Sequence, residues 1–160
     1  MFTAKFWLKK TNLFLLAVLC VSVLAAGDVS ARRRVSMKGA HGWGADSEYN
    51  RLYGKGRQTS ITGVVVAIGT MVPLPGMSYG VFLSVKTVSG IVTVHLAPGW
   101  YIENQEFIIA PKDKVSVKGS MAEIGGKDVL LASEIRKEHL TLKLRDKNGF
   151  PFWCAWHVKD

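Results

Sequence analysis

The sequence predicts an all-β domain, a small barrel of five short strands with a helical connection between the third and the fourth. The first observation is a hairpin over 79–102, where apolar and polar residues alternate with a period of two on both sides of Ser89-Gly90. The second is a series of short apolar runs over 60–138, separated by glycine and proline turns. A β-sandwich is the alternative, but it normally needs about seven strands.

The elements of the first half can be read in order. In 47–53 a capping serine precedes apolar residues at spacings of three and four, which predicts one or two helical turns. The β-branched run 60–71 predicts a bent first strand, and the prolines of 72–77 predict a loop. The two hairpin strands follow, and a break at Pro98-Gly99 leads into a short helix or turn over 100–107.

The second half is predicted to be another hairpin. A turn at 111–114 precedes a fourth strand over 115–124, and a Gly-Gly turn leads to a fifth strand over 128–136. One more short strand is predicted over 141–144, followed by an aromatic tail that folds back on the barrel. Five strands with a helical link between the third and the fourth are the layout of an OB-fold.

The N-terminus predicts export. Three lysines precede an apolar run over 13–24 that ends in small residues, which is the pattern of a cleaved secretory signal over 1–26. The run is shorter than the roughly 20 residues that cross a bilayer, so an uncleaved anchor is the weaker interpretation. We expect a periplasmic mature chain without an integral membrane span. Its parts are a basic leader with a short helical segment over 27–59, the OB-fold barrel over 60–138, and a C-terminal strand with an aromatic tail over 139–160.

The basic charge lies in the flanks of the predicted barrel. Removal of residues 1–26 lowers the formal net charge from +9 to +6, because three lysines and no acidic residues are lost. Residues 60–138 carry seven basic and seven acidic side chains, whereas the leader contains the triplet 32–34 of arginines. Nucleic acids are bound through basic stripes rather than through net charge. A solvated run is therefore the main interpretation of the triplet, and a membrane or nucleic-acid contact is the other.

The outward face of the predicted hairpin is the usual ligand platform of an OB-fold. Together with the connection that follows, it supplies six candidate ligand-binding residues: Phe82, Lys86, Thr93, His95, Trp100 and Tyr101. One aromatic residue and one lysine on the strands are few for a single-stranded nucleic-acid site, which normally has several stacking rings in a positive groove. The alternative is that Phe82 is covered by the C-terminal tail, Trp100 closes one end of the barrel and Lys86 is solvated.

The sequence contains no recognisable catalytic or metal-binding motif. The four histidines show no HxH or HExxH spacing, and the pair Cys154 and His157 lacks further local ligands, so neither a metal nor a cofactor is expected. No serine lies in a nucleophile-elbow motif, so we do not expect an enzyme. Cys154 is the only cysteine after removal of the signal. It is either buried beside the neighbouring aromatic residues, which we favour, or available to pair with another chain.

The segment GIVTVHLAPGWYIENQEFIIAPKDKVSVKG over 90–119 resembles a bacterial OB-fold family of exported, stress-associated proteins. Pro111, Asp113, Val115 and Gly119 match that family's turn into the fourth strand, and Trp100 matches the tryptophan of its connection. HGWGADSEYNRLY and LRDKNGFPFW are similar to segments of uncharacterised exported proteins described as OB-fold or DNA-binding-like. The resemblance implies an OB-fold in the envelope with a binding role, and it specifies no ligand.

These observations predict an exported, non-catalytic OB-fold protein that acts as a binding or stress-protective module in the periplasm. Its partner is expected to be a small molecule, an oligosaccharide or a protein of the envelope. The second hypothesis is binding of single-stranded DNA or another polyanion through the OB face and the basic flanks. The third is an apolar groove around Trp100 that receives a protein partner.

Overall fold

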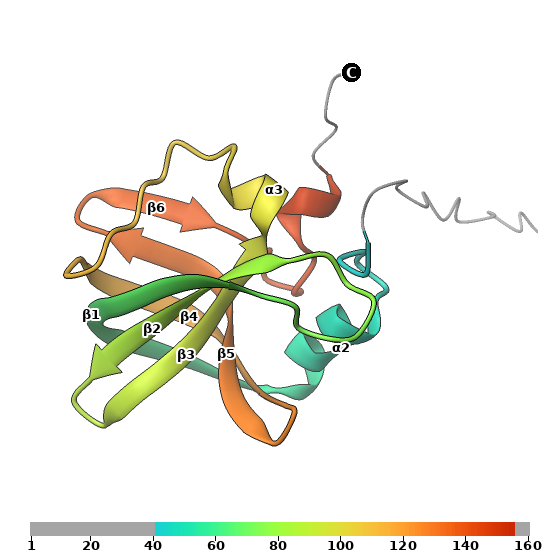
Figure 1. The fold of residues 1–160 in the computed structure, drawn as a ribbon, viewed down its shortest axis with the longest axis horizontal. Helices are drawn as coiled ribbons and strands as arrows, with labels where there is room; N and C mark the ends of the chain where they lie inside the picture. Colours follow the sequence, from blue (N-terminus) through green and yellow to red (C-terminus); the bar gives the residue numbers. More distant parts are fainter. Residues whose placement is uncertain (1–40, 156–160) are drawn as a thin grey trace, which may run out of the picture. The chain divides into compact units, whose positions relative to one another are not determined.

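Six strands form one sheet that closes on itself (Figure 1). The computed structural model describes residues 41–155, which belong to one compact unit, Ser36–Asp160. The strands are β1 (Arg57–Met71), β2 (Gly80–Thr87), β3 (Gly90–Pro98), β4 (Lys114–Ile124), β5 (Lys127–Lys137) and β6 (Leu140–Lys143).

The sheet has the order β3-β2-β1-β4-β5-β6, and neighbours in this order are antiparallel. In addition, β3 pairs in parallel with β5 over three residue pairs, from Thr93 with Val129 to His95 with Leu131. This pairing closes a ring of five strands. β6 lies outside the ring, where it pairs with the second half of β5.

The predicted all-β class is confirmed, and so is the extra short strand near 141–144, which is β6. Two boundaries differ from the prediction. β1 begins at Arg57 rather than at residue 60, because residues 57–59 of the predicted leader already pair with β4. The helix α3 (Gly99–Ile102) ends well before residue 107. Its end is fixed by two side chains, since Asn104 donates to the Trp100 carbonyl at 2.6 Å and Gln105 to the Tyr101 carbonyl at 3.2 Å.

The core is built by the inward positions of the strands. The alternation in the hairpin predicted an aliphatic face, and Leu83, Val85, Val94 and Leu96 are fully buried. Burial of a side chain of this size typically stabilises a fold by about 1.5–3 kcal/mol. Six further aliphatic residues are fully buried: Val117 of β4, Leu130, Leu131 and Ile135 of β5, and Val65 and Leu144.

The predicted helix before β1 is confirmed as α2 (Glu48–Lys55). Ser47 is its N-cap, with Oγ accepting from the Asn50 backbone N–H at 3.2 Å. The spacing of three and four residues places Tyr49 and Tyr53 on the buried side. Near the C-terminal end, the short 3-10 helix η1 (Phe152–Cys154) buries Trp153. Both flanks of the ring therefore contribute aromatic residues to the interior.

Some predictions concern residues outside the described part. This group includes the predicted signal over 1–26, the leader up to residue 40, and residues 156–160. Within 41–155, no helix is long and apolar enough to cross a membrane.

Gly119→Ala is expected to destabilise the fold. A Cβ at this position in β4 would lie 2.2 Å from the Leu131 carbonyl oxygen, a backbone atom of the neighbouring strand. Overpacking of this kind typically costs about 1–3 kcal/mol, which urea unfolding would measure as a lower free energy of unfolding. Gly54→Ala in α2 is the control, because an added Cβ there meets nothing within 4 Å. Equal stability of the two variants would contradict the described packing of β4 on β5.

Candidate functional site

The six predicted ligand-binding residues fall into two groups. Phe82, Lys86 and Thr93 lie on the outer face of β2 and β3, where Lys86 is exposed and the other two are half-buried. His95 and Tyr101 are buried, and Trp100 is half-buried against the core. The structure thus brings the first three together on an accessible face and places the other three in or beside the interior.

Exposed apolar residues extend the accessible face. Ile91, the cross-strand partner of Lys86, is 67 % exposed. Val66 is 43 % exposed and lies at a bulge of β1. The Phe82 ring lies over Gly69, where a Cβ would be 2.7 Å from the ring. We call this surface the hairpin face and define it by five residues: Val66, Phe82, Lys86, Ile91 and Thr93.

A second group of polar residues surrounds Arg145, which was not among the predicted site residues. The Arg145 side chain is 3 % exposed and donates to the Ala132 carbonyl and, at 3.2 Å, to Asn50 Oδ1. Its guanidinium carbon lies 5.1 Å from the ring centroid of Tyr53 and 4.7 Å from that of Trp153. Within the described residues Arg145 forms no ion pair. Neutral acceptors and aromatic faces therefore stabilise its buried charge.

Tyr49 and His95 lie close to this cation. The Tyr49 hydroxyl and His95 Nδ1 are hydrogen-bonded at 3.2 Å, and the two rings are stacked. Burial lowers the pKa of His95 to about 4, and the positive charge of Arg145 adds to the shift. His95 is therefore neutral near pH 7 and forms part of the packed interior.

The Trp43 carbonyl connects the two flanks of the ring. It accepts from Asn50 Nδ2 at 3.1 Å, from Trp153 Nε1 at 2.8 Å and from Cys154 Sγ at 3.6 Å. The favoured prediction for Cys154 was burial, and the side chain is half-buried in this position. Burial also raises the pKa of the thiol, which favours its protonated form.

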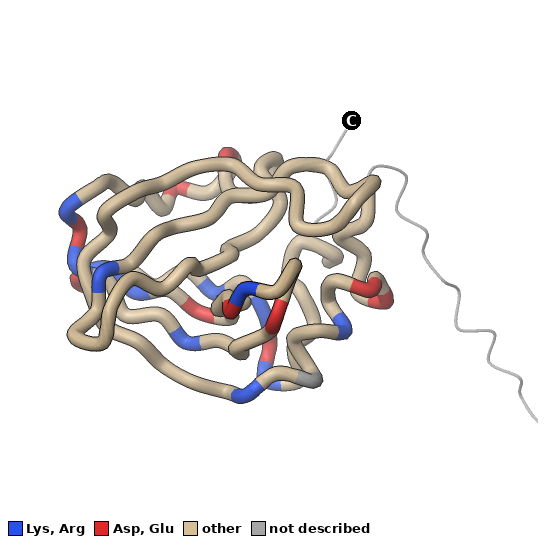
Figure 2. Tube along the Cα trace, turned by 60° about the horizontal axis from the view of Figure 1, so that its bottom comes forward, with Lys and Arg blue, Asp and Glu red and all other residues tan. Residues whose placement is uncertain are grey.

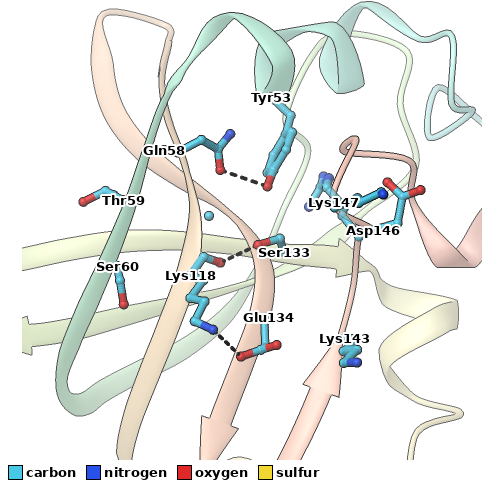
Figure 3. A pocket seen from close by; sticks show the side chains of 12 residues that line it. Tyr53, Gln58, Thr59, Ser60, Lys118, Ser133, Glu134, Lys143, Asp146 and Lys147 are labelled. Carbon is cyan, nitrogen blue, oxygen red and sulfur yellow. Dashed lines mark hydrogen bonds and ion pairs between the residues drawn. The ribbon is translucent and has the colours of Figure 1, made fainter.

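Arg145 also lines an open groove of about 760 Å³ (Figure 3). A row of paired residues crosses four strands here, because Ser60 is paired with Lys118, Lys118 with Glu134 and Glu134 with Lys143. Figure 3 shows these side chains on one side of the sheet, with Tyr53 and Gln58 at one end. We call this site the basic groove. Its lining consists of Tyr53, Gln58, Thr59, Ser60, Lys118, Gly119, Ser133, Glu134, Lys143, Arg145, Asp146 and Lys147.

Sequence reasoning found part of the signal for this groove. A short strand was predicted over 141–144, and in the structure the exposed Lys143 alternates with the buried Leu142 and Leu144. Nothing local indicated that Arg145 is buried, since arginine is normally exposed. Among residues 41–155, no three His, Cys, Asp or Glu side chains are grouped as metal ligands.

The pKa of His95 predicts a pH-dependent stability. Above pH 6.5 the imidazole is neutral in the folded and the unfolded chain. As the pH falls from 6.5 towards 4, the unfolded chain binds a proton that the folded chain does not, so stability is lost, by up to about 3 kcal/mol. His95→Gln should remove this contribution. Urea unfolding at pH 7 and pH 4.5 measures the free energy of unfolding of wild type and variant. A difference between the two proteins that is the same at both pH values would contradict the prediction.

A protein-family model matches the sequence over all five strands of the ring. The sequence model of the MamS/MamX magnetosome protein family matches residues 57–142, which run from the start of β1 into β6. No protein with a curated description matches the chain.

This match shows that the predicted membership in a bacterial OB-fold family of exported, stress-associated proteins is wrong. The residues behind that resemblance have local roles. Asp113 Oδ2 accepts from the Ala110 backbone N–H at 2.7 Å, and Gly119 permits close contact between β4 and β5. Such requirements apply to turns into strands in general, and they do not identify a family. The match covers more than half of the sequence, and the chain belongs to the MamS/MamX magnetosome protein family.

Proposed function

We propose that the chain is an exported, non-catalytic binding module of the magnetosome, and that its five-stranded ring is a small barrel of the OB type. The description of its family supports the magnetosome, and the pattern of residues 1–26 supports export. Two features support the OB type: the closure of the ring by β3 and β5, and the helix α3 between β3 and β4. The stress-protective role depended on the corrected resemblance and is not part of this proposal.

The observation that carries the binding role is the hairpin face. Ile91 is an exposed apolar residue and the cross-strand partner of Lys86, and Val66 is exposed at the bulge of β1, the strand that pairs with β2. Grouped exposed apolar residues often mark interaction sites, and strands two and three form the ligand platform of OB-folds. A protein partner with apolar side chains and a carboxylate opposite Lys86 fits this face.

Single-stranded nucleic acid is the second candidate, and it has less support. Stacking needs accessible rings, but among the described residues the aromatic ring on this face is that of Phe82, which lies against Gly69. His95 and Tyr101, which were expected to help, are buried.

The double variant Lys86→Glu/Ile91→Ser tests the binding role. The tagged mature chain is used to capture partners from an extract of magnetosome-bearing cells. Reversal of the charge and loss of the apolar contact should reduce the captured protein by at least about tenfold, which corresponds to about 1.4 kcal/mol. Lys127→Glu is the matched control, because Lys127 is also exposed but lies at the β4–β5 hairpin. Equal capture by both variants and wild type would reject the hairpin face.

Export is tested separately by comparing the full chain with a chain that lacks residues 2–26. The full chain should be shortened by processing and should appear in the periplasmic or magnetosome fraction on immunoblots. The truncated chain should stay in the cytoplasm because it lacks the signal. An unprocessed full chain in the cytoplasmic fraction would refute export.

A further inference from the structure

We propose that the basic groove binds a small multivalent oxyanion, that is, a molecule carrying phosphate or carboxylate groups. The groove is a separate site from the hairpin face, since its lining comes from the start of β1, from β4, β5 and β6, and from residues 145–147. The proposal therefore does not depend on the protein partner proposed above.

The two carboxylates in the groove are already engaged. Glu134 Oε1 lies 3.2 Å from Lys118 Nζ and 3.3 Å from Arg136 Nε. Asp146 Oδ1 accepts from the backbone N–H groups of Asn148 and Phe150, both at 2.8 Å. Within the described residues, neither carboxylate forms an ion pair with Lys143, Arg145 or Lys147.

Three cations in the lining of the groove form no ion pair with a carboxylate in the described part of the chain. Lys143 and Lys147 are exposed, and within residues 41–155 neither forms an ion pair. Arg145 is buried among neutral groups, and its Nε has no hydrogen-bond partner in the described part of the chain. A buried charge is screened less than an exposed one, so its field extends into the groove. An anion placed there would interact with two flexible ammonium groups and with this field.

The rest of the lining suits an oxyanion. Thr59 and Ser60 contribute hydroxyl groups and Gln58 contributes an amide, whereas the Ser133 hydroxyl already donates to the Lys118 carbonyl at 3.1 Å. Hydroxyl and amide groups donate hydrogen bonds to phosphate and carboxylate oxygens. The volume of about 760 Å³ lies within the usual range for small-molecule sites, roughly 300–1,000 Å³.

The surroundings of the groove favour a small ligand over a polymer. Figure 2 shows Asp and Glu positions interspersed with Lys and Arg positions along the chain. Two acidic residues, Glu134 and Asp146, lie within the groove lining itself, so its cations do not form an uninterrupted basic stripe. A nucleic acid needs such a stripe, because its affinity comes from many phosphate contacts. At one end the groove is bounded by Tyr53 and Gln58, which are hydrogen-bonded to each other at 3.2 Å.

Titration calorimetry of the mature chain with pyrophosphate and with citrate tests the site at low ionic strength. At least one of the anions should bind, and the stronger of the two identifies phosphate or carboxylate as the preferred group. Lys143→Glu/Lys147→Glu should weaken this binding by at least about tenfold, and added salt should weaken it further. Lys143 is the cross-strand partner of Glu134, so its replacement by glutamate adds a repulsion that lowers the thermal unfolding midpoint. Lys143→Gln/Lys147→Gln avoids this repulsion; it should keep the midpoint of wild type, because both lysines are exposed, and should also weaken anion binding.

Two control variants make the result specific. Lys127→Glu and Lys114→Glu change exposed lysines outside the groove, and each should keep the affinity within about twofold of wild type. Three results would overturn the proposal: no binding of either anion at millimolar concentration, an equal loss in the control variants, or tighter binding of oligo(dT) than of both small anions. The last result would assign the groove to a polymer.

Discussion

The buried charge of Arg145 is the constraint on which the arrangement of the other parts depends. A guanidinium removed from water must be stabilised by acceptors and ring faces, and a buried charge that loses its partners destabilises a protein by several kcal/mol. Here the partners are the Ala132 carbonyl of β5, Asn50 and Tyr53 of α2, and Trp153 of η1. One side chain therefore contacts the ring, the helix before it and the segment after β6.

This constraint explains why the regions beyond the family match are integral to the fold. The match covers residues 57–142. Trp43 and Tyr49 precede the matched range, and Arg145 and Trp153 follow it. The two flanks contact each other directly, through the hydrogen bond from Trp153 Nε1 to the Trp43 carbonyl and through their rings. The basic groove also draws Tyr53 and residues 143–147 from the flanks. The family match thus covers the ring and seven of the twelve groove residues, whereas the three groove cations that form no ion pair among the described residues, Lys143, Arg145 and Lys147, lie beyond it.

Local patterns in the sequence predicted most of the strands, because a period of two and a glycine turn depend on neighbouring residues alone. Gly125 and Gly126, for example, both have positive φ angles in the turn that they predicted. The burial of His95 was not predictable in this way. Alternation predicted that it faces outward with Thr93, but the Tyr49 ring, 46 residues earlier in the chain, is stacked on it and hydrogen-bonded to it in the interior. Arg145 is a similar case, since its acceptors lie 13 and 95 residues away along the chain.

The pairing of β5 limits where the length of the chain can change. One edge of β5 pairs with β4, and the other pairs first with β3 and then with β6. Insertion or deletion of one residue would turn one half of the strand over, for example exchanging the buried Ile135 for Glu134 or the exposed Arg136, and would break at least two ladders at once. The connection between α3 and β4 belongs to no ladder. Length variation in evolution, and a tag or domain inserted in the laboratory, should therefore be tolerated in that connection and not in the 11 residues of β5.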